Sequence, residues 1–240
     1  MMSEANTTGG QTDGPGLVGC LFGIPVELDS AEVVLIPVPW EVTVSYGGGA
    51  SGGPQAILDA SPQLDTHLPR LEEALKPRIA MEPIPADWLA RSEALRSRVA
   101  PWIGWLEEGH SPSVASAEQL GLLAEVEGAC EELNDWVAAR AAQHLAHGRI
   151  VGVVGGDHST PLGLIQALAQ REAAFGILQI DAHADLRVAY EGFPYSHASI
   201  MTNALKLPQV KRLVQVGLRD TCAQEEAVIA DSGGRIMAYH

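Results

Sequence analysis

The stretch AFGILQIDAHADLR, residues 174–187, joins an apolar run to three side chains that can bind a metal ion. The run AFGILQI (174–180) has the length and composition of a buried strand. Directly after it, Asp181, His183 and Asp185 alternate with two alanines. Side chains of an extended segment point alternately to two sides, so the three polar side chains are predicted to face one cavity. The pattern therefore predicts a strand that ends in a metal site.

A second polar turn follows the preceding predicted strand. RIVGVV (149–154) is typical of a strand, and GGDHST (155–160) comes directly after it. Ligands of parallel α/β sheets collect beyond the carboxyl ends of the strands. Two neighbouring strand ends would therefore bring His158 to the three polar side chains of the first stretch. A lone Asp or His at such a place is more often a turn residue or a satisfied polar group, but the two segments together favour a metal site.

The ligand types narrow the choice of metal. Carboxylate and imidazole together suit Mn²⁺, Zn²⁺ or Fe²⁺. Two aspartates and two histidines exceed what one tetrahedral site with an open position needs. A pair of ions that share a bridging carboxylate is therefore one interpretation of this set, because such a pair can lower the pKa of a bridging water.

Strands and helices alternate along most of the chain. This alternation, with continuous apolar strands, predicts an α/β fold with a parallel sheet covered on both faces. Residues 69–116 are predicted to be peripheral helices and loops, residues 1–16 a disordered tail, and residues 17–240 a single domain. Further strands are predicted within 31–40, 210–218 and 234–239, and helices within 45–61, 116–148, 161–170, 196–207 and 222–231.

Composition excludes several classes of protein. The chain has 240 residues and a formal net charge of −15, which disfavours nucleic acid and anionic membranes as partners and suits small cationic ligands. No apolar run reaches the roughly 20 residues that span a bilayer, and the polar start MMSEANTTGG is not a secretory signal. Three widely spaced cysteines, without a CxxC pair, predict reduced thiols. We therefore expect a cytoplasmic protein.

Three motifs resemble signatures of one family. GGDHS (155–159), DAHADLR (181–187) and YSHASIM (195–201) look like three motifs of the ureohydrolases, which include arginase, agmatinase and formimidoylglutamase. The stretch VPWEVTVSYGGGASGGPQAILDAS (38–61) is similar to the amino-terminal part of agmatinase-like members. The resemblance runs from about residue 31 to the end of the sequence.

The resemblance implies a three-layer α/β/α fold that holds two Mn²⁺ ions. By motif position, His158 and Asp185 ligate one ion, His183 ligates the other, and Asp181 bridges both. A metal-bridging hydroxide, which Asp185 also holds by a hydrogen bond, attacks the carbon of a guanidinium or amidine group. His197 falls where the family places a proton-shuttling histidine.

Further implications concern the substrate and the assembly. Arg187 could contact the substrate tail, and a surface salt bridge is the alternative for this residue. The agmatinase-like motifs imply conversion of agmatine, a small cationic guanidino compound, to putrescine and urea. Arginase, guanidinobutyrase, guanidinase and formimidoylglutamase activities remain alternatives. The resemblance also implies trimers or hexamers.

The sequence departs from the family pattern near its end. Family members carry a later strand that ends in an Asp-x-Asp pair and completes both metal sites. The sequence has no such pair after residue 185, and Asp220 and Asp231 are predicted to lie in a loop and a helix, outside the site. We therefore expect a carboxyl-truncated ureohydrolase that lacks the last strands, binds a second ion weakly or not at all, and turns over little. The alternative is a non-catalytic, metal-deficient homologue that binds a partner subunit through an unpaired strand edge.

Overall fold

The structure, a computed structural model, describes residues 16–64 and 78–240 and has an α/β fold with parallel strands. The predicted tail lies outside these residues except for its last position. The strands are β1 (Val33–Val38), β2 (Ile79–Met81), β3 (Ile150–Gly155), β4 (Phe175–Ile180), β5 (Val210–Val216) and β6 (Ile236–Tyr239). The helices are α1 (Gly53–Ala60), α2 (Ala86–Glu107), α3 (Ala117–Ala146), α4 (Leu162–Arg171), α5 (Ile200–Leu205) and α6 (Ala223–Asp231).

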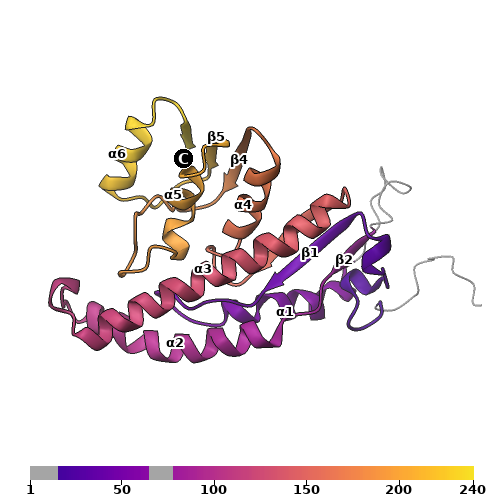
Figure 1. Ribbon diagram of the computed structural model, residues 1–240, viewed down its shortest axis with the longest axis horizontal. Helices are drawn as coiled ribbons and strands as arrows, with labels where there is room; N and C mark the ends of the chain where they lie inside the picture. The colour runs from indigo at the N-terminus through magenta and orange to yellow at the C-terminus, as the bar shows by residue number, and fades with distance from the viewer. Residues whose placement is uncertain (1–15, 65–77) are drawn as a thin grey trace, which may run out of the picture.

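The strands form two separate parallel sheets. The first has the order β2-β1-β3 and the second the order β4-β5-β6. Figure 1 shows the long helices α2 and α3 beside the first sheet, and α4, α5 and α6 in the half that contains the second. The predicted parallel α/β architecture is confirmed. The predicted single sheet is replaced by two three-stranded ones, because β3 and β4 do not pair with each other.

Helix α2 confirms that residues 69–116 contain a helix, but its core residues contradict the prediction that this region is peripheral. Residues 65–77 lie outside the described part, but residues 86–107 form one helix of 22 residues, and a short strand, β2, precedes it. The helix contributes Leu95, Val99 and Trp102 to the main core, where they pack with β1 and α3. These residues recur at spacings of three and four and so form one face of the helix. Pro101 and the mixed polarity of the segment obscured this stripe in the sequence.

Helix α3 lies within the range predicted for it, 116–148, and begins with a capping box. Ser116 accepts a hydrogen bond from the backbone N–H of Gln119, and the Gln119 side chain accepts one from the backbone N–H of Ser116. This capping box satisfies donors that the first turn leaves free. Further along, Val137 of α3 packs so close to Gly163 of α4 that a Cβ on Gly163 would lie 2.7 Å from the Val137 Cβ. Glycine is therefore required where the two helices cross.

Within residues 16–64 and 78–240, the second sheet is covered on one face only. Leu213 and Ile236 are buried on the covered face, where they pack with residues of α4 and α5. On the opposite face, Ile180, Val216 and Tyr239 are paired in register and are 80%, 39% and 50% exposed. The prediction that the whole sheet is covered on both faces is wrong for this half. We call this surface, with Leu178, the bare face.

Among the described residues, no helix is both long enough and apolar enough to cross a membrane.

Candidate metal centre

The carboxyl ends of β3 and β4 bring three potential ligands together. The Nδ1 atom of His158 lies 2.7 Å from Oδ2 of Asp185 and 3.1 Å from Oδ2 of Asp181. One ligand atom from each residue lies within 4.8 Å of the others. The two strands belong to different sheets, so the cluster joins the two halves of the molecule.

The segment after β4 does not stay extended, which corrects the predicted alternation of side chains. Asp185 has a φ of 53°, in the left-handed region, so the chain turns there. Aspartate tolerates this conformation better than most residues because its short carboxylate can bond locally. The turn buries the Asp185 side chain to 6% exposure, whereas that of His183 remains 59% exposed. The three predicted ligands therefore do not share one side of a strand.

His183 lies beside the three-residue cluster and contacts a carboxylate that the sequence interpretation left outside the site. Its Nδ1 atom is 3.5 Å from Oδ1 of Asp181, and its Nε2 atom is 3.7 Å from Oδ2 of Asp220. Asp220 follows β5, and a parallel β-bridge pairs it with His183. The two oxygens of Asp181 therefore face two different imidazoles, an arrangement that suits a bridging carboxylate.

The electrostatics of the cluster favour positive charge. Burial disfavours the charged form of His158, but the hydrogen bond to Asp185 and the charges of Asp185 and Asp181 outweigh it and raise the pKa of the imidazole. Burial likewise acts to raise the pKa of Asp181. The backbone N–H of His183 and the charge of His158 reverse that effect and lower the pKa of Asp181. Two carboxylates around one imidazole form a donor set that fits a divalent cation.

The turn that carries His158 is held by its neighbours. The backbone N–H of Asp157 donates to the carbonyl of Trp40, at the end of β1. The buried Asp157 carboxylate accepts a hydrogen bond from the backbone N–H of Ser159, and burial raises its pKa. A Cβ at Gly156 would lie 2.2 Å from the Trp40 oxygen, so this position requires glycine. The residues around His158 in GGDHS thus have structural roles.

His197 and Arg187 lie outside the three-residue cluster. His197 begins a short 3-10 turn before α5, and its Nδ1 atom is buried with no hydrogen-bond partner among the described residues. The Arg187 guanidinium lies over the ring of Tyr190, 4.9 Å from its centre. This contact is a cation–π interaction, and the role of Arg187 at the substrate tail stays a prediction.

The sequence interpretation missed a pair of glutamines beneath the cluster. Gln179 of β4 and Gln215 of β5 are 4% and 0% exposed and hydrogen-bond to each other. Gln179 also donates to Asp185. The available signal was a glutamine within the apolar carboxyl-terminal part of each strand, ILQI in β4 and LVQV in β5.

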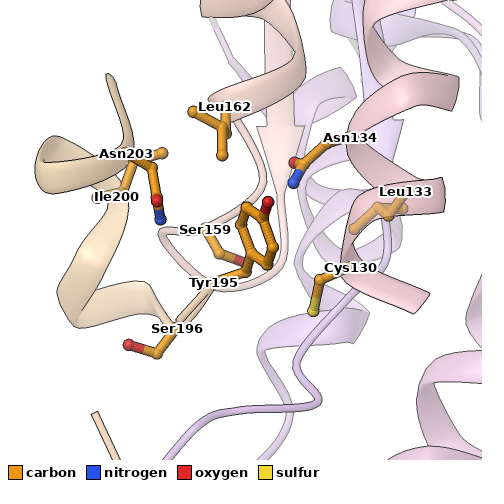
Figure 2. A pocket seen from close by; sticks show the side chains of 9 residues that line it. All are labelled: Cys130, Leu133, Asn134, Ser159, Leu162, Tyr195, Ser196, Ile200 and Asn203. Atoms are coloured by element: carbon orange, nitrogen blue, oxygen red, sulfur yellow. The ribbon is translucent and has the colours of Figure 1, made fainter. Parts of the chain in front are cut away.

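A small cavity lies near the turn that carries His158. Figure 2 shows side chains from α3, the Ser159 turn and the start of α5 converging on a space of about 10 Å³. Tyr195 and Asn134 contribute polar groups to its wall. A space of this size holds about one water molecule, so it is too small to bind a substrate.

Comparison with known proteins adds the family. The model of the arginase family matches residues 31–240. An N(1)-aminopropylagmatine ureohydrolase of Thermus thermophilus is 33% identical over 195 residues, which cover 80% of this chain and 52% of that protein. An agmatinase of Bacillus subtilis is 24% identical over 213 residues, which cover 89% of this chain and 61% of the relative. The chain thus spans about half the length of the Thermus thermophilus relatives.

Solved structures share the fold. An arginase from Medicago truncatula superposes with a TM-score of 0.63 at 21% identity, covering 87% of this chain and 57% of that one. An agmatine ureohydrolase of Thermoplasma volcanium gives a TM-score of 0.59 at 20% identity, covering 88% and 57%. The matched family model covers every strand and helix described above. The chain therefore belongs to the arginase family.

Proposed function

We propose that the protein is a metal-dependent ureohydrolase that cleaves a C–N bond of a small cationic guanidino compound and releases urea. The observation that supports it best is the cluster of His158, Asp181 and Asp185, with ligand atoms within 4.8 Å of one another at two strand ends. The relatives are named ureohydrolases and agmatinases, which supports the reaction class.

In this proposal the cluster holds Mn²⁺. His158 and Asp185 would hold the first ion, and Asp181 and His183 would hold a second one. The bound metal supplies the positive charge that makes water a nucleophile at neutral pH. In the described part of the chain, this proposal assigns two ligands, Asp181 and His183, to the second ion, so that ion is expected to bind more weakly than the first.

Two other residues have proposed roles in turnover. His197 would hold the proton that the departing amine needs, because an imidazole nitrogen can carry and donate a proton. Arg187 would contact the substrate tail.

The proposed substrate is agmatine or its aminopropyl derivative. The names of the relatives and the net charge of −15 support a cationic polyamine tail. The assembly into trimers or hexamers stays a prediction.

The test measures Mn²⁺ binding to the 240-residue chain by electron paramagnetic resonance, and urea release from a panel of guanidino compounds. The panel includes agmatine, aminopropylagmatine, arginine and guanidinobutyrate, so that it varies the tail charge. Asp185→Asn is expected to weaken Mn²⁺ binding at least about tenfold. Asp231→Asn removes one exposed charge at the end of α6 and is expected to leave binding unchanged.

Each outcome decides between the candidate functions. A folded chain that binds no Mn²⁺ would contradict the proposal. Mn²⁺ binding without product from any substrate would favour a non-catalytic homologue that binds a partner subunit through an unpaired strand edge.

A further inference from the structure

A buried chain of amide groups lies directly beneath the candidate metal centre. Gln179 and Gln215 are register partners in β4 and β5 and point to the covered face of the sheet. Gln215 Nε2 donates to Oε1 of Gln179 at 2.6 Å and to the carbonyl of Ala184 at 2.7 Å. Gln179 Nε2 donates to the carbonyl of His183 at 3.1 Å and to Oδ2 of Asp185 at 3.3 Å. Each of the two amide nitrogens therefore makes two hydrogen bonds.

These glutamines are unusual for their place in the fold. The covered face of a parallel sheet is normally filled by aliphatic side chains, and a buried amide destabilises the fold unless it is paired. The strands of the first sheet, VVLIPV, IAM and IVGVVG, contain no polar side chain. The polar pair thus occurs in the sheet whose strand end carries Asp185.

The oxygen that Gln179 contacts is also the oxygen that faces His158. Oδ2 of Asp185 lies 2.7 Å from Nδ1 of His158. A donor on that same atom fixes the rotation of the carboxylate and so fixes which oxygen is presented to the cluster. Asp185 also has a φ of 53°, a conformation that persists only where the surroundings hold it. The bonds from the glutamines to the His183 and Ala184 carbonyls hold the backbone just before this residue.

We propose that Gln215 and Gln179 form a positioning relay that orients Asp185 for the metal ion. Gln215 fixes the amide of Gln179, and Gln179 fixes the carboxylate and the turn. The inference rests on the proposed function, since it takes Asp185 as a metal ligand. Outer partners of this kind typically change metal affinity by about 10- to 100-fold.

The test compares three variants of the full chain. Gln179→Met and Gln215→Met keep the side-chain length but remove the amide. Ser116→Ala removes the helix cap of α3 and controls for a loss of stability away from the site. Mn²⁺ affinity is measured by electron paramagnetic resonance. Hydrogen exchange of the Leu186 and Arg187 amides, both hydrogen-bonded in the turn, is measured in the metal-free chain.

The expected results are graded. Gln179→Met should weaken Mn²⁺ binding about 10- to 100-fold and speed exchange of the two amides. Gln215→Met should weaken binding less, because it acts through Gln179, and it carries the test if Gln179→Met does not fold. Ser116→Ala should change neither measurement.

Three results would overturn the relay or separate it from the proposed function. Unchanged Mn²⁺ affinity in both glutamine variants would overturn the relay, even if exchange in the turn became faster. An equal loss of affinity in Ser116→Ala would show that general stability is responsible and would also overturn it. No Mn²⁺ binding by the unchanged chain would remove the proposed function, and unaltered exchange in the glutamine variants would then reject the ordering of the turn independently.

Discussion

Strands β1 and β4 have the same length and similar apolar sequences, VVLIPV and FGILQI, but very different surroundings. No side chain of β1 is exposed, because α2 and α3 pack against its sheet. In β4, Leu178 and Ile180 are 65% and 80% exposed on the bare face. A run of aliphatic residues therefore shows that a strand is suited to burial on both faces, but not that both faces are covered.

The candidate metal centre lies where the two sheets meet. His158 follows a strand of the first sheet, whereas Asp181 and Asp185 follow a strand of the second. A cation bound by His158, Asp181 and Asp185 would link the half of the molecule that contains the first sheet to the half that contains the second. The same ion would stabilise the folded chain, because it binds the folded state preferentially.

The largest expected difference in stability is between two Ile→Ala variants, one in β1 and one in β4. Ile36 of β1 is fully buried and Ile180 of β4 is 80% exposed. Ile36→Ala should lower the free energy of unfolding by about 3 to 4 kcal/mol, through lost burial and the cavity left behind. Ile180→Ala should lower it by less than about 1 kcal/mol. Urea unfolding followed by circular dichroism measures both, and equal losses would show that the bare face is covered in solution.

The second prediction concerns a buried ionic cluster in the first half. Glu82 is 4% exposed, and its carboxylate accepts hydrogen bonds from Arg140 and His144, each at 2.5 Å through Oε1. Glu82→Gln should lower the free energy of unfolding at pH 7 by about 3 kcal/mol, because it leaves buried donors without their charged partner.

The pH dependence of that loss follows from the pKa of Glu82. Burial acts to raise this pKa, but the hydrogen bonds from Arg140 and His144 outweigh it and lower the pKa below its ordinary value of 4.5. The stabilisation is therefore complete above pH 4.5 and disappears as the pH falls through the lower folded value. Unfolding of both proteins at pH 7, 5 and 4 measures the difference. A difference that grew toward low pH would contradict the direction of the shift.

Local pattern was enough to predict most of the elements. Helix α3 and strands β3 to β6 lie near the bounds that the sequence predicts for them. Which strands pair with each other was harder to predict. The sequence suggested that β3 and β4 are neighbours in one sheet, but the structure places them in different sheets. The pairing of strands depends on contacts between residues far apart in the sequence, so no short stretch of the sequence predicts the division into two sheets.

The sequence predicted which residues meet at the site, but not how their side chains are oriented. His158, Asp181 and Asp185 meet, as their places after two strands suggested. The spacing of residues does not predict the left-handed conformation of Asp185, nor that its side chain is buried while that of His183 is exposed. Asp220 lies beside His183 because β5 pairs with β4, a contact of 37 residues' separation in sequence that only the sheet register reveals.

A smaller effect is expected where α6 supports the metal-site turn. Glu225 is 5% exposed and accepts hydrogen bonds from the backbone N–H groups of Leu186 and Cys222, each at 3.0 Å. Glu225→Ala leaves both donors without this acceptor and should lower the free energy of unfolding by about 2 kcal/mol. Glu226→Ala, at the exposed neighbouring position, should change it by less than about 0.5 kcal/mol. Equal effects in urea unfolding would show that Glu225 acts only through its place in α6.

The smallest expected change in stability tests the bare face directly. Ile180→Lys places a charge among Leu178, Val216 and Tyr239 and should change the free energy of unfolding by less than about 0.5 kcal/mol if water already covers this face. The same substitution should reduce the fluorescence of a dye that binds exposed apolar surface, because contiguous apolar patches bind such ligands. Val114→Lys, at an isolated position that is 69% exposed, should leave the fluorescence unchanged. A large loss of stability with Ile180→Lys would mean that another surface covers the bare face in solution. The difference in exposure between β1 and β4 would then hold only for a single isolated chain.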